Sequence, residues 1–211
     1  MKYIIWDWNG TLLDDVALCI DVMNGMLRRR GLSPLTPGRY REIFTFPVEN
    51  YYRAAGLDLE SEPFTALAAE YISEFDRRVM DCGLRPGTIE ALERLKGAGY
   101  AQLIVSASQR SALARQVESR GLTGYFKAVL GIGDILAVTK EGVAKEYLEK
   151  NGIKGEDAVF IGDTGHDWQV ARAIGCRCVL MEGGHESRRR LERTEAVIVS
   201  NAAGALSVIL G

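Results

Sequence analysis

Hydrophobic and polar positions follow two different patterns along this chain. In its second half, short apolar runs alternate with stretches in which apolar residues recur every three or four positions. The short runs are typical of buried strands, and the wider spacing is typical of helices with one buried face. This pattern predicts strands near 101–106, 127–131, 157–162 and 177–181, helices near 87–98, 109–120, 141–151 and 166–174, and a last strand–helix pair over 196–209.

The first part of the chain has a different pattern. An apolar run, Ile4-Ile5-Trp6, predicts a buried strand that ends at Asp7. Helical patterns then follow one another without a strand between them, near 15–31, 37–44, 47–56 and 61–81. Residues 83–87 return the chain to the alternating pattern, and Pro86 is suited to the start of a helix. The helical stretch therefore predicts an inserted cap.

Repeated strand–helix units favour a mostly parallel sheet that is covered on both faces. We therefore predict an α/β fold, a Rossmann-like parallel sheet with helices on both faces and an inserted small α-helical cap. The predicted core domain comprises residues 1–14 and 84–211, and the predicted cap domain comprises residues 15–83.

Composition narrows the classes of partner. At 211 residues the chain can bury a sizeable core, and its net charge of −2 gives no reason to expect nucleic acid or a membrane surface as a partner. No apolar run reaches membrane-spanning length, and the short apolar start lacks a cleavage site, so we expect a cytoplasmic protein. The four cysteines lack zinc or redox spacing, and Cys176 and Cys178 are predicted to be small core residues.

Acidic side chains follow two of the predicted strands. Asp7 ends the first strand, and Asp163 and Asp167 lie in a glycine-containing loop after strand 157–162. The carboxyl ends of strands are where α/β sheets bind their ligands. Two acidic sites at this edge predict a metal-assisted reaction on a charged substrate.

These motifs resemble those of the haloacid dehalogenase-like hydrolase superfamily, especially its phosphoglycolate phosphatase-like branch. Its first motif, Asp-x-Asp-Gly-Thr, is similar to Asp7-Trp8-Asn9-Gly10-Thr11, and its last, Gly-Asp-[Ser/Thr]-x-x-Asp, matches residues 162–167. The resemblance covers nearly the whole chain, and the cap is its least specific part.

The resemblance implies a magnesium-dependent phosphatase. Asp7 takes the place of the nucleophile that forms an aspartyl-phosphate, a recognised type of covalent catalysis. Asp163 resembles the metal-ligating acid and Asp167 the acid that supports the metal shell, while the main-chain carbonyl of Asn9 takes the place of a further Mg²⁺ ligand. A main-chain carbonyl is unaffected by an exchange of Asp for Asn, so the metal site is expected to persist.

The resemblance also implies phosphate-binding residues. Ser106 ends a predicted strand as in the second motif, and its hydroxyl and the Ala107 amide are expected to hold phosphoryl oxygens. We place Gly10 and Thr11, which turn the chain after Asp7, in the same substrate-binding group. Lys140 fits the charge-neutralising lysine of the third motif, because it follows the apolar Ile135–Val138 and precedes a helix, whereas Lys145 lies inside that helix.

Asn9 departs from the family pattern, because an aspartate there protonates the leaving oxygen and an amide has no titrating proton near neutral pH. The chain is then a phosphatase with another proton source or a good leaving group, a catalyst for another bond, or a non-catalytic or weakly active phosphate-binding or regulatory protein. Phosphonate-cleaving relatives need a cap lysine, and residues 3–95 contain none. Dehalogenases lack this pair of acids, so a phosphatase is the leading hypothesis.

Other candidates are less specific. A cap arginine among Arg39, Arg41 and Arg53 could bind a substrate carboxylate or second phosphate, although surface solvation explains these residues equally well. His166, between the acids of the last motif, is a stronger candidate than His185 for tuning them. The runs 28–30 and 188–190, three arginines each, are predicted to be solvated helix surface. We expect a small phosphorylated metabolite as substrate, and the oligomeric state stays open.

Overall fold

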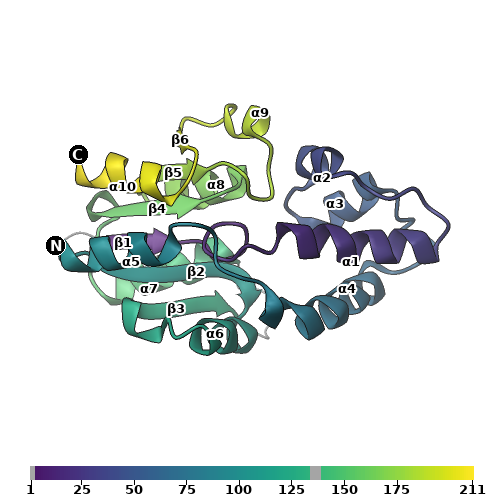
Figure 1. The fold of residues 1–211 in the computed structure, drawn as a ribbon, viewed down its shortest axis with the longest axis horizontal. Helices are drawn as coiled ribbons and strands as arrows, with labels where there is room; N and C mark the ends of the chain where they lie inside the picture. Colours follow the sequence, from purple (N-terminus) through teal and green to yellow (C-terminus); the bar gives the residue numbers. More distant parts are fainter. Residues whose placement is uncertain (1–2, 134–138) are drawn as a thin grey trace.

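A single parallel sheet organises the larger part of the molecule. The computed structural model describes residues 3–133 and 139–211, and within them six strands pair in the order β3-β2-β1-β4-β5-β6 (Figure 1). The strands are β1 (Tyr3–Trp6), β2 (Ala101–Gln109), β3 (Phe126–Ile132), β4 (Ala158–Gly162), β5 (Arg177–Met181) and β6 (Val197–Val199). The predicted α/β fold with a parallel sheet is confirmed.

Helices cover both faces of this sheet because its strands are apolar on both sides. Ile4 and Trp6 of β1 contribute to the core beneath α5 (Thr88–Gly97), α6 (Arg110–Ser119) and α10 (Ala202–Leu210). Ile5, on the opposite side of the strand, belongs to the core beneath α7 (Lys140–Lys150) and α8 (Gly165–Ala173). The period of two along β1 thus feeds two separate hydrophobic layers.

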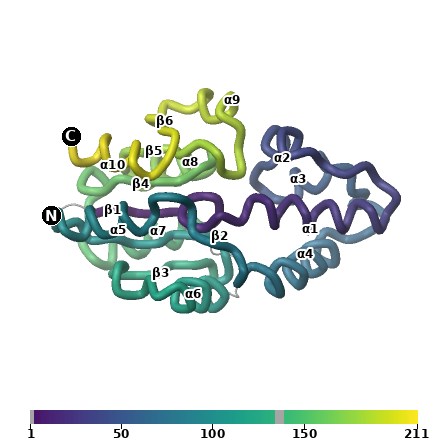
Figure 2. Tube along the Cα trace, viewed as in Figure 1, coloured from purple at the N-terminus to yellow at the C-terminus, as the bar shows by residue number. Residues whose placement is uncertain are grey.

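The remaining helices form a unit with a hydrophobic core of its own. The chain leaves β1, passes through α1 (Val16–Arg29), α2 (Pro37–Ile43), α3 (Val48–Ala55) and α4 (Phe64–Arg78), and returns to the sheet at α5 (Figure 2). Buried residues from these helices, including Met23, Tyr40, Tyr52 and Leu67, pack together. The unit lies beyond the carboxyl ends of the strands (Figure 1), in the position expected of a cap.

The structure adds short elements that periodicity did not predict. They are α9 (Arg188–Leu191) and the 3₁₀ turns Val79–Asp81, Thr123–Tyr125 and Gly155–Asp157. Each is too short for a 3.6-residue pattern to develop. Strand β2 also extends to Gln109, beyond the predicted end at 106, with an irregularity in its pairing with β3 between Val105 and Gln109. The apolar run Ile135–Val138, which we used to locate Lys140, lies outside the described residues.

The arginine runs are more than solvated surface. Arg190 of α9 is only 17% exposed, pairs with Glu186 at 3.0 Å and donates to the Phe44 carbonyl of the cap. Arg189 pairs with Glu42 of α2. In the other run, Arg30 pairs with Glu62 and Glu70 at 2.6 and 2.7 Å. The prediction of solvated surface was wrong for Arg30 and Arg190, which contact residues distant in sequence, whereas Arg189 is 70% exposed as expected.

No helix among the described residues has both the length and the apolar character that a membrane crossing requires.

Candidate active site

The predicted site residues meet at the carboxyl edge of the sheet, where the strand order changes direction between β1 and β4. Asp7 follows β1, and its backbone N–H donates to the Ile161 carbonyl of β4 over 2.8 Å. Asp163 follows β4, and Lys140 begins α7. This edge is the usual ligand-binding position of a doubly wound sheet.

Three buried carboxylates form the centre of the site. Oxygen atoms of Asp7, Asp163 and Asp167 lie within 4.8 Å of one another. Lys140 Nζ contacts Asp7 Oδ1 and donates to Asp167 Oδ1 over 2.5 Å. Lys145, five residues along the same helix, is exposed. The structure therefore brings Lys140, and not Lys145, to the acids, as the sequence predicted.

Asp167 also shapes the helix on which it lies. Thr164 caps α8, and the Asp167 side chain returns to the Thr164 backbone N–H, which completes a capping box. Asp167 Oδ2 accepts from Thr164 Oγ1 over 2.7 Å, so both of its oxygens already have donors. Burial opposes its ionisation, but Lys140, Thr164 and His166 together outweigh burial and lower the pKa of Asp167.

The other two acids ionise less readily. Burial, opposed by Lys140 and reinforced by Asp167 and Asp163, raises the pKa of Asp7 to about 8. Burial likewise raises the pKa of Asp163, against the charge of His185. When ionised, the three carboxylates beside the single positive charge of Lys140 leave a net charge of −2, which a divalent cation would neutralise. Hard oxygen donors are the ligands that Mg²⁺ prefers, so the donor set fits this ion.

Two glycines allow the loops to approach Asp163 closely. Gly10 has φ +70°, and a Cβ on it would lie 2.5 Å from Asp163 Oδ2. A Cβ on Gly184 would lie 2.1 Å from the same oxygen. Thr11 Oγ1 donates to Asp163 Oδ1 over 2.9 Å, and the His185 backbone N–H donates to Oδ2 over 2.6 Å. These contacts aim Asp163 at Asp7.

Asn9 is held by a network that the sequence did not reveal. Its Nδ2 donates to Asp15 Oδ2 over 2.7 Å, and its Oδ1 accepts from Ser108 Oγ over 2.7 Å. These two contacts fix the orientation of the Asn9 amide, because the ionised Asp15 carboxylate can only accept hydrogen bonds and must therefore face the NH₂ group. Gly10 N donates to Asp15 Oδ1 over 2.8 Å, which ties the whole loop to Asp15.

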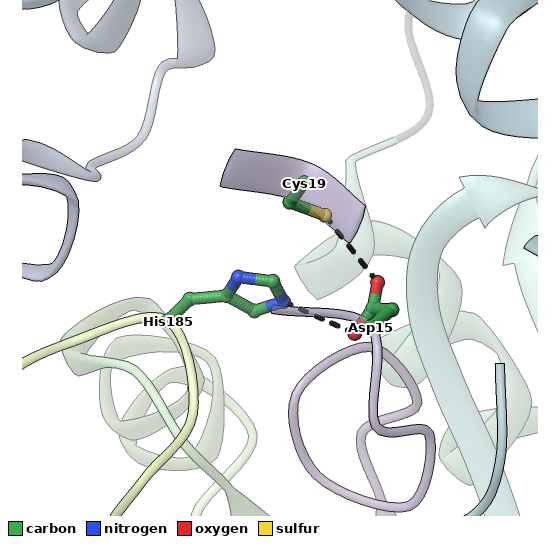
Figure 3. Close-up of side chains that lie close together, drawn as sticks. All are labelled: Asp15, Cys19 and His185. Atoms are coloured by element: carbon green, nitrogen blue, oxygen red, sulfur yellow. Dashed lines mark hydrogen bonds and ion pairs between the residues drawn. The ribbon is translucent and has the colours of Figure 1, made fainter. Parts of the chain in front are cut away.

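His185 and Cys19 also contact Asp15 (Figure 3). His185 Nε2 lies 3.5 Å from Asp15 Oδ1, and its Nδ1 lies 2.7 Å from the Tyr40 hydroxyl of the cap. Burial opposes the charge of His185, but Asp15, Asp163 and Asp7 together outweigh burial and raise the pKa of His185 to about 9. Although Asp15, Cys19 and His185 are close enough to share a metal, their contacts with one another use both Asp15 oxygens. We therefore interpret this cluster as a hydrogen-bond network.

A cavity of about 470 Å³ separates the acids from the cap. Asp7, Asn9, Asp163 and Lys140 line its floor, together with Ser106 and Ala107 of β2. Ser106 Oγ accepts a hydrogen bond from the Ser108 backbone N–H over 3.1 Å, so the end of β2 turns about the Ser106 side chain. Of the two histidines, His185 lines this cavity, whereas His166 stacks on Phe46 with ring centroids 4.5 Å apart. The structure thus places the histidine that the sequence ranked lower, His185, at the cavity, while the charge of His166 contributes to the lowered pKa of Asp167.

Several residues of the site escaped the sequence analysis. Asp15 was assigned to the cap helix, Ser108 was given no role of its own beside Ser106, and Gly184 and His185 were assigned to no motif. The pair Gly183-Gly184, one residue after the predicted strand 177–181, was the one available signal, since such a loop permits close backbone approach. None of the three cap arginines is among the described residues that line the cavity: Arg41 donates to the Gly184 carbonyl over 2.9 Å, and Arg53 pairs with Glu49 at 2.9 Å.

Known proteins resemble this chain along most of its length. A phosphoglycolate phosphatase of Rhodobacter capsulatus is 30% identical over 86% of this chain and 84% of its own. A probable phosphatase of Dickeya dadantii is 25% identical over 98% and 94%. A haloacid dehalogenase-like hydrolase structure from Streptococcus pneumoniae, 21% identical, has a TM-score of 0.85 over 99% of this chain and 98% of its own. Residues 4–181 match the haloacid dehalogenase-like hydrolase family. With that match, the shared fold and the acids at the sheet edge, this chain belongs to the haloacid dehalogenase-like hydrolases.

Proposed function

We propose that this protein is a magnesium-dependent phosphatase that hydrolyses a small phosphorylated metabolite through an aspartyl-phosphate on Asp7. One observation carries the proposal. Lys140 holds Asp7 through Oδ1, while Oδ2 accepts no hydrogen bond from the described residues and Asp7 lines the cavity. An oriented carboxylate with one unengaged oxygen is suited to in-line attack on phosphorus. The core of residues 1–14 and 84–211 and the cap of residues 15–83 belong to the same proposal.

The proposed magnesium ligands are Asp7, Asp163 and the Asn9 main-chain carbonyl, with Asp167 supporting the shell. When bound, the ion would neutralise charge on the phosphoryl oxygens. Lys140 orients Asp7 and adds a positive charge beside it. Gly10, Thr11, Ser106 and Ala107 are proposed to hold the phosphoryl group through backbone N–H groups and hydroxyls.

The proposed reaction has two displacement steps. Asp7 Oδ2 forms a bond to phosphorus while the bond from phosphorus to the ester oxygen breaks, and that oxygen leaves with the electron pair. A water molecule then attacks the phosphoryl group, which releases inorganic phosphate and restores the Asp7 carboxylate. Asn9 can donate a hydrogen bond but cannot transfer a proton in either step.

A phosphate-release assay tests this proposal. The wild type is assayed on a panel of phosphate esters with Mg²⁺ and with a chelator, and Asp7→Asn and Asp163→Asn are compared with Lys145→Ala. Turnover should require Mg²⁺, fall to background in both aspartate variants and persist in Lys145→Ala. Metal-independent turnover, or full activity in Asp7→Asn, would contradict the mechanism.

The second candidate is a non-catalytic phosphate-binding or regulatory protein. The hydrogen bond from Asn9 to Asp15 favours it, because the amide is fixed in the place where the family has its proton donor. Mg²⁺-dependent binding of phosphate esters without turnover of any of them would support this candidate over the phosphatase.

A further inference from the structure

The cap side of the cavity is apolar and rich in aromatic rings. Phe44, Phe46, Phe64, Tyr71 and Phe75 all line it. The volume of about 470 Å³ lies within the range of about 300–1,000 Å³ that is typical of sites for small organic ligands. It leaves room for an aromatic ring beside the phosphoryl group. Aromatic side chains bind such a ring through buried area and ring contacts.

The same cavity lacks a free cation for a second anionic group. Among the described residues that line it, Lys140 is the only lysine or arginine, and Asp7 and Asp167 already hold its ammonium group. His185 is the other basic lining residue, and both of its ring nitrogens have partners, the Tyr40 hydroxyl and Asp15. A substrate carboxylate would thus lie against apolar side chains, which is unfavourable for an unpaired charge.

Asn9 restricts the leaving group further. A leaving oxygen without a proton donor departs as an anion, and its pKa then governs the rate. A phenol has a pKa of about 10. An alcohol has a pKa close to that of water, which is about 15.7. An aryl oxygen can therefore leave without the proton that Asn9 cannot supply, while an alkyl oxygen cannot do so readily.

The apolar cavity and the missing proton donor at Asn9 agree, and we infer that the substrates of this site are aryl phosphates, the phosphate monoesters of phenols. The inference rests on the proposed phosphatase function. In the reaction, the bond from phosphorus to the aryl oxygen breaks as the bond to Asp7 forms, and the phenolate takes up a proton from water afterwards.

Binding and turnover test the two halves of the inference separately. Titration calorimetry of the Mg²⁺-loaded wild type compares phenylphosphonate with phosphonoacetate. Both resist hydrolysis, and the first carries a phenyl ring where the second carries a carboxylate. Phenylphosphonate should bind at least tenfold more tightly. Equal affinities, tighter binding of phosphonoacetate, or binding of neither would overturn the inference.

Turnover compares phenyl phosphate with benzyl phosphate, since both carry a ring but only the first has an aryl oxygen. We expect kcat for phenyl phosphate to be higher by about 10²-fold or more, the lower end of the range for general acid catalysis. Similar rates would overturn the leaving-group argument. If neither ester is turned over but phenylphosphonate still binds preferentially, the proposed phosphatase function fails and the site binds aryl phosphates without hydrolysis.

A cap variant tests where the ring binds. Ile72 lines the cavity and is 55% exposed, so Ile72→Arg should fold and place a cation beside the ring site. It should reduce the preference for phenylphosphonate at least fivefold. The control is Ile89→Arg, because Ile89 on α5 is 40% exposed and is absent from the cavity lining. An unchanged preference in Ile72→Arg, or the same loss in Ile89→Arg, would contradict this placement.

Discussion

At the scale of single residues, Asn9 and Asp15 act as a pair. In the family pattern position 9 carries an acid, but here an acid would meet the Asp15 carboxylate at the distance of the present hydrogen bond, 2.7 Å. Burial opposes ionisation of Asp15, yet His185 and the donors from Asn9 and Gly10 keep the pKa of Asp15 below its usual value. The amide at position 9 thus matches the charge next to it.

This pairing predicts that Asn9→Asp alone is not a simple gain of a proton donor. Two adjacent buried carboxyl groups should lower the free energy of unfolding by about 1–3 kcal/mol, because like charges cannot both ionise there. The double variant Asn9→Asp/Asp15→Asn exchanges the two groups and should recover most of this loss. Urea denaturation at pH 7 measures both effects, and equal stability of the single and double variants would contradict the pairing.

The double variant should also change the choice of leaving group. With a carboxyl at position 9 that is no longer opposed by Asp15, hydrolysis of benzyl phosphate should rise by about 10²–10⁴. Phenyl phosphate should change far less. A comparison of kcat for the two esters checks this, and a uniform rise in both would point to a general effect on the site.

Lys140 is the second residue whose role can be tested alone. Lys140→Ala should abolish detectable turnover and cost the metal-free protein about 3–5 kcal/mol, because removal of one partner leaves buried carboxylates uncompensated. Lys145→Ala, on the exposed side of the same helix, should change activity less than twofold, in line with the small effect of surface charges. Denaturation measures the loss of stability and phosphate release measures the loss of activity. A larger loss in Lys145→Ala than in Lys140→Ala would show that Lys140 is not the lysine of the third motif.

At the scale of elements, the loops after β1 and β5 converge on Asp163, which itself follows β4. The loop after β1 contributes Gly10 and Thr11, and the loop after β5 contributes Gly184 and the His185 backbone N–H. The β5 loop also continues into α9, whose arginines hold the cap. One connection thus positions a metal-site acid and anchors the cap.

Gly184→Ala should therefore weaken the metal site. The new Cβ would lie 2.1 Å from Asp163 Oδ2, so the loop or the carboxylate must move. We expect at least a tenfold loss of Mg²⁺ affinity by calorimetry. Gly97→Ala is the control, because nothing lies within 4 Å of its Cβ position at the end of α5. It should leave affinity unchanged and, as a helical Gly→Ala exchange, alter stability by less than about 1 kcal/mol.

At the scale of the whole molecule, the link between His185, Asp15 and Tyr40 joins cap and core. The pKa of His185 is raised to about 9 from an ordinary value of 6.5. A basic group with a raised pKa in the folded state stabilises the protein below the unfolded pKa, and this contribution disappears as the pH rises through the folded pKa. The relevant window is therefore pH 6.5 to 9.

We expect metal-free wild type to lose about 2 kcal/mol more than His185→Gln between these two pH values. The variant serves as the reference, and the difference measures His185 together with its electrostatic coupling to Asp15 and Asp163. Urea denaturation in chelator at each pH measures the difference. An equal loss in both proteins would mean that His185 is neutral throughout the window.

The sequence by itself determined the alternation of strands and helices, the inserted helical stretch and the positions of Asp7, Asp163 and Lys140. Each depends on local patterns: apolar spacing marks an element, and parallel strands bring their carboxyl ends to one edge whatever fills the space between them. The location of Lys140 was accessible for the same reason, since a residue that begins a helix after a strand lies at that edge, whereas its proposed role came from the resemblance to the family.

Only the tertiary structure decided what surrounds these residues. The contacts of Asn9 with Asp15 and Ser108, the approach of Gly184 to Asp163 and the link from Arg190 to Phe44 join segments with no shared periodicity. The apolar cavity likewise combines cap rings, which read as ordinary helix core in the sequence, with the acids of the sheet. Periodicity shows which side of an element is buried, but it does not show whether that side faces the core or a ligand.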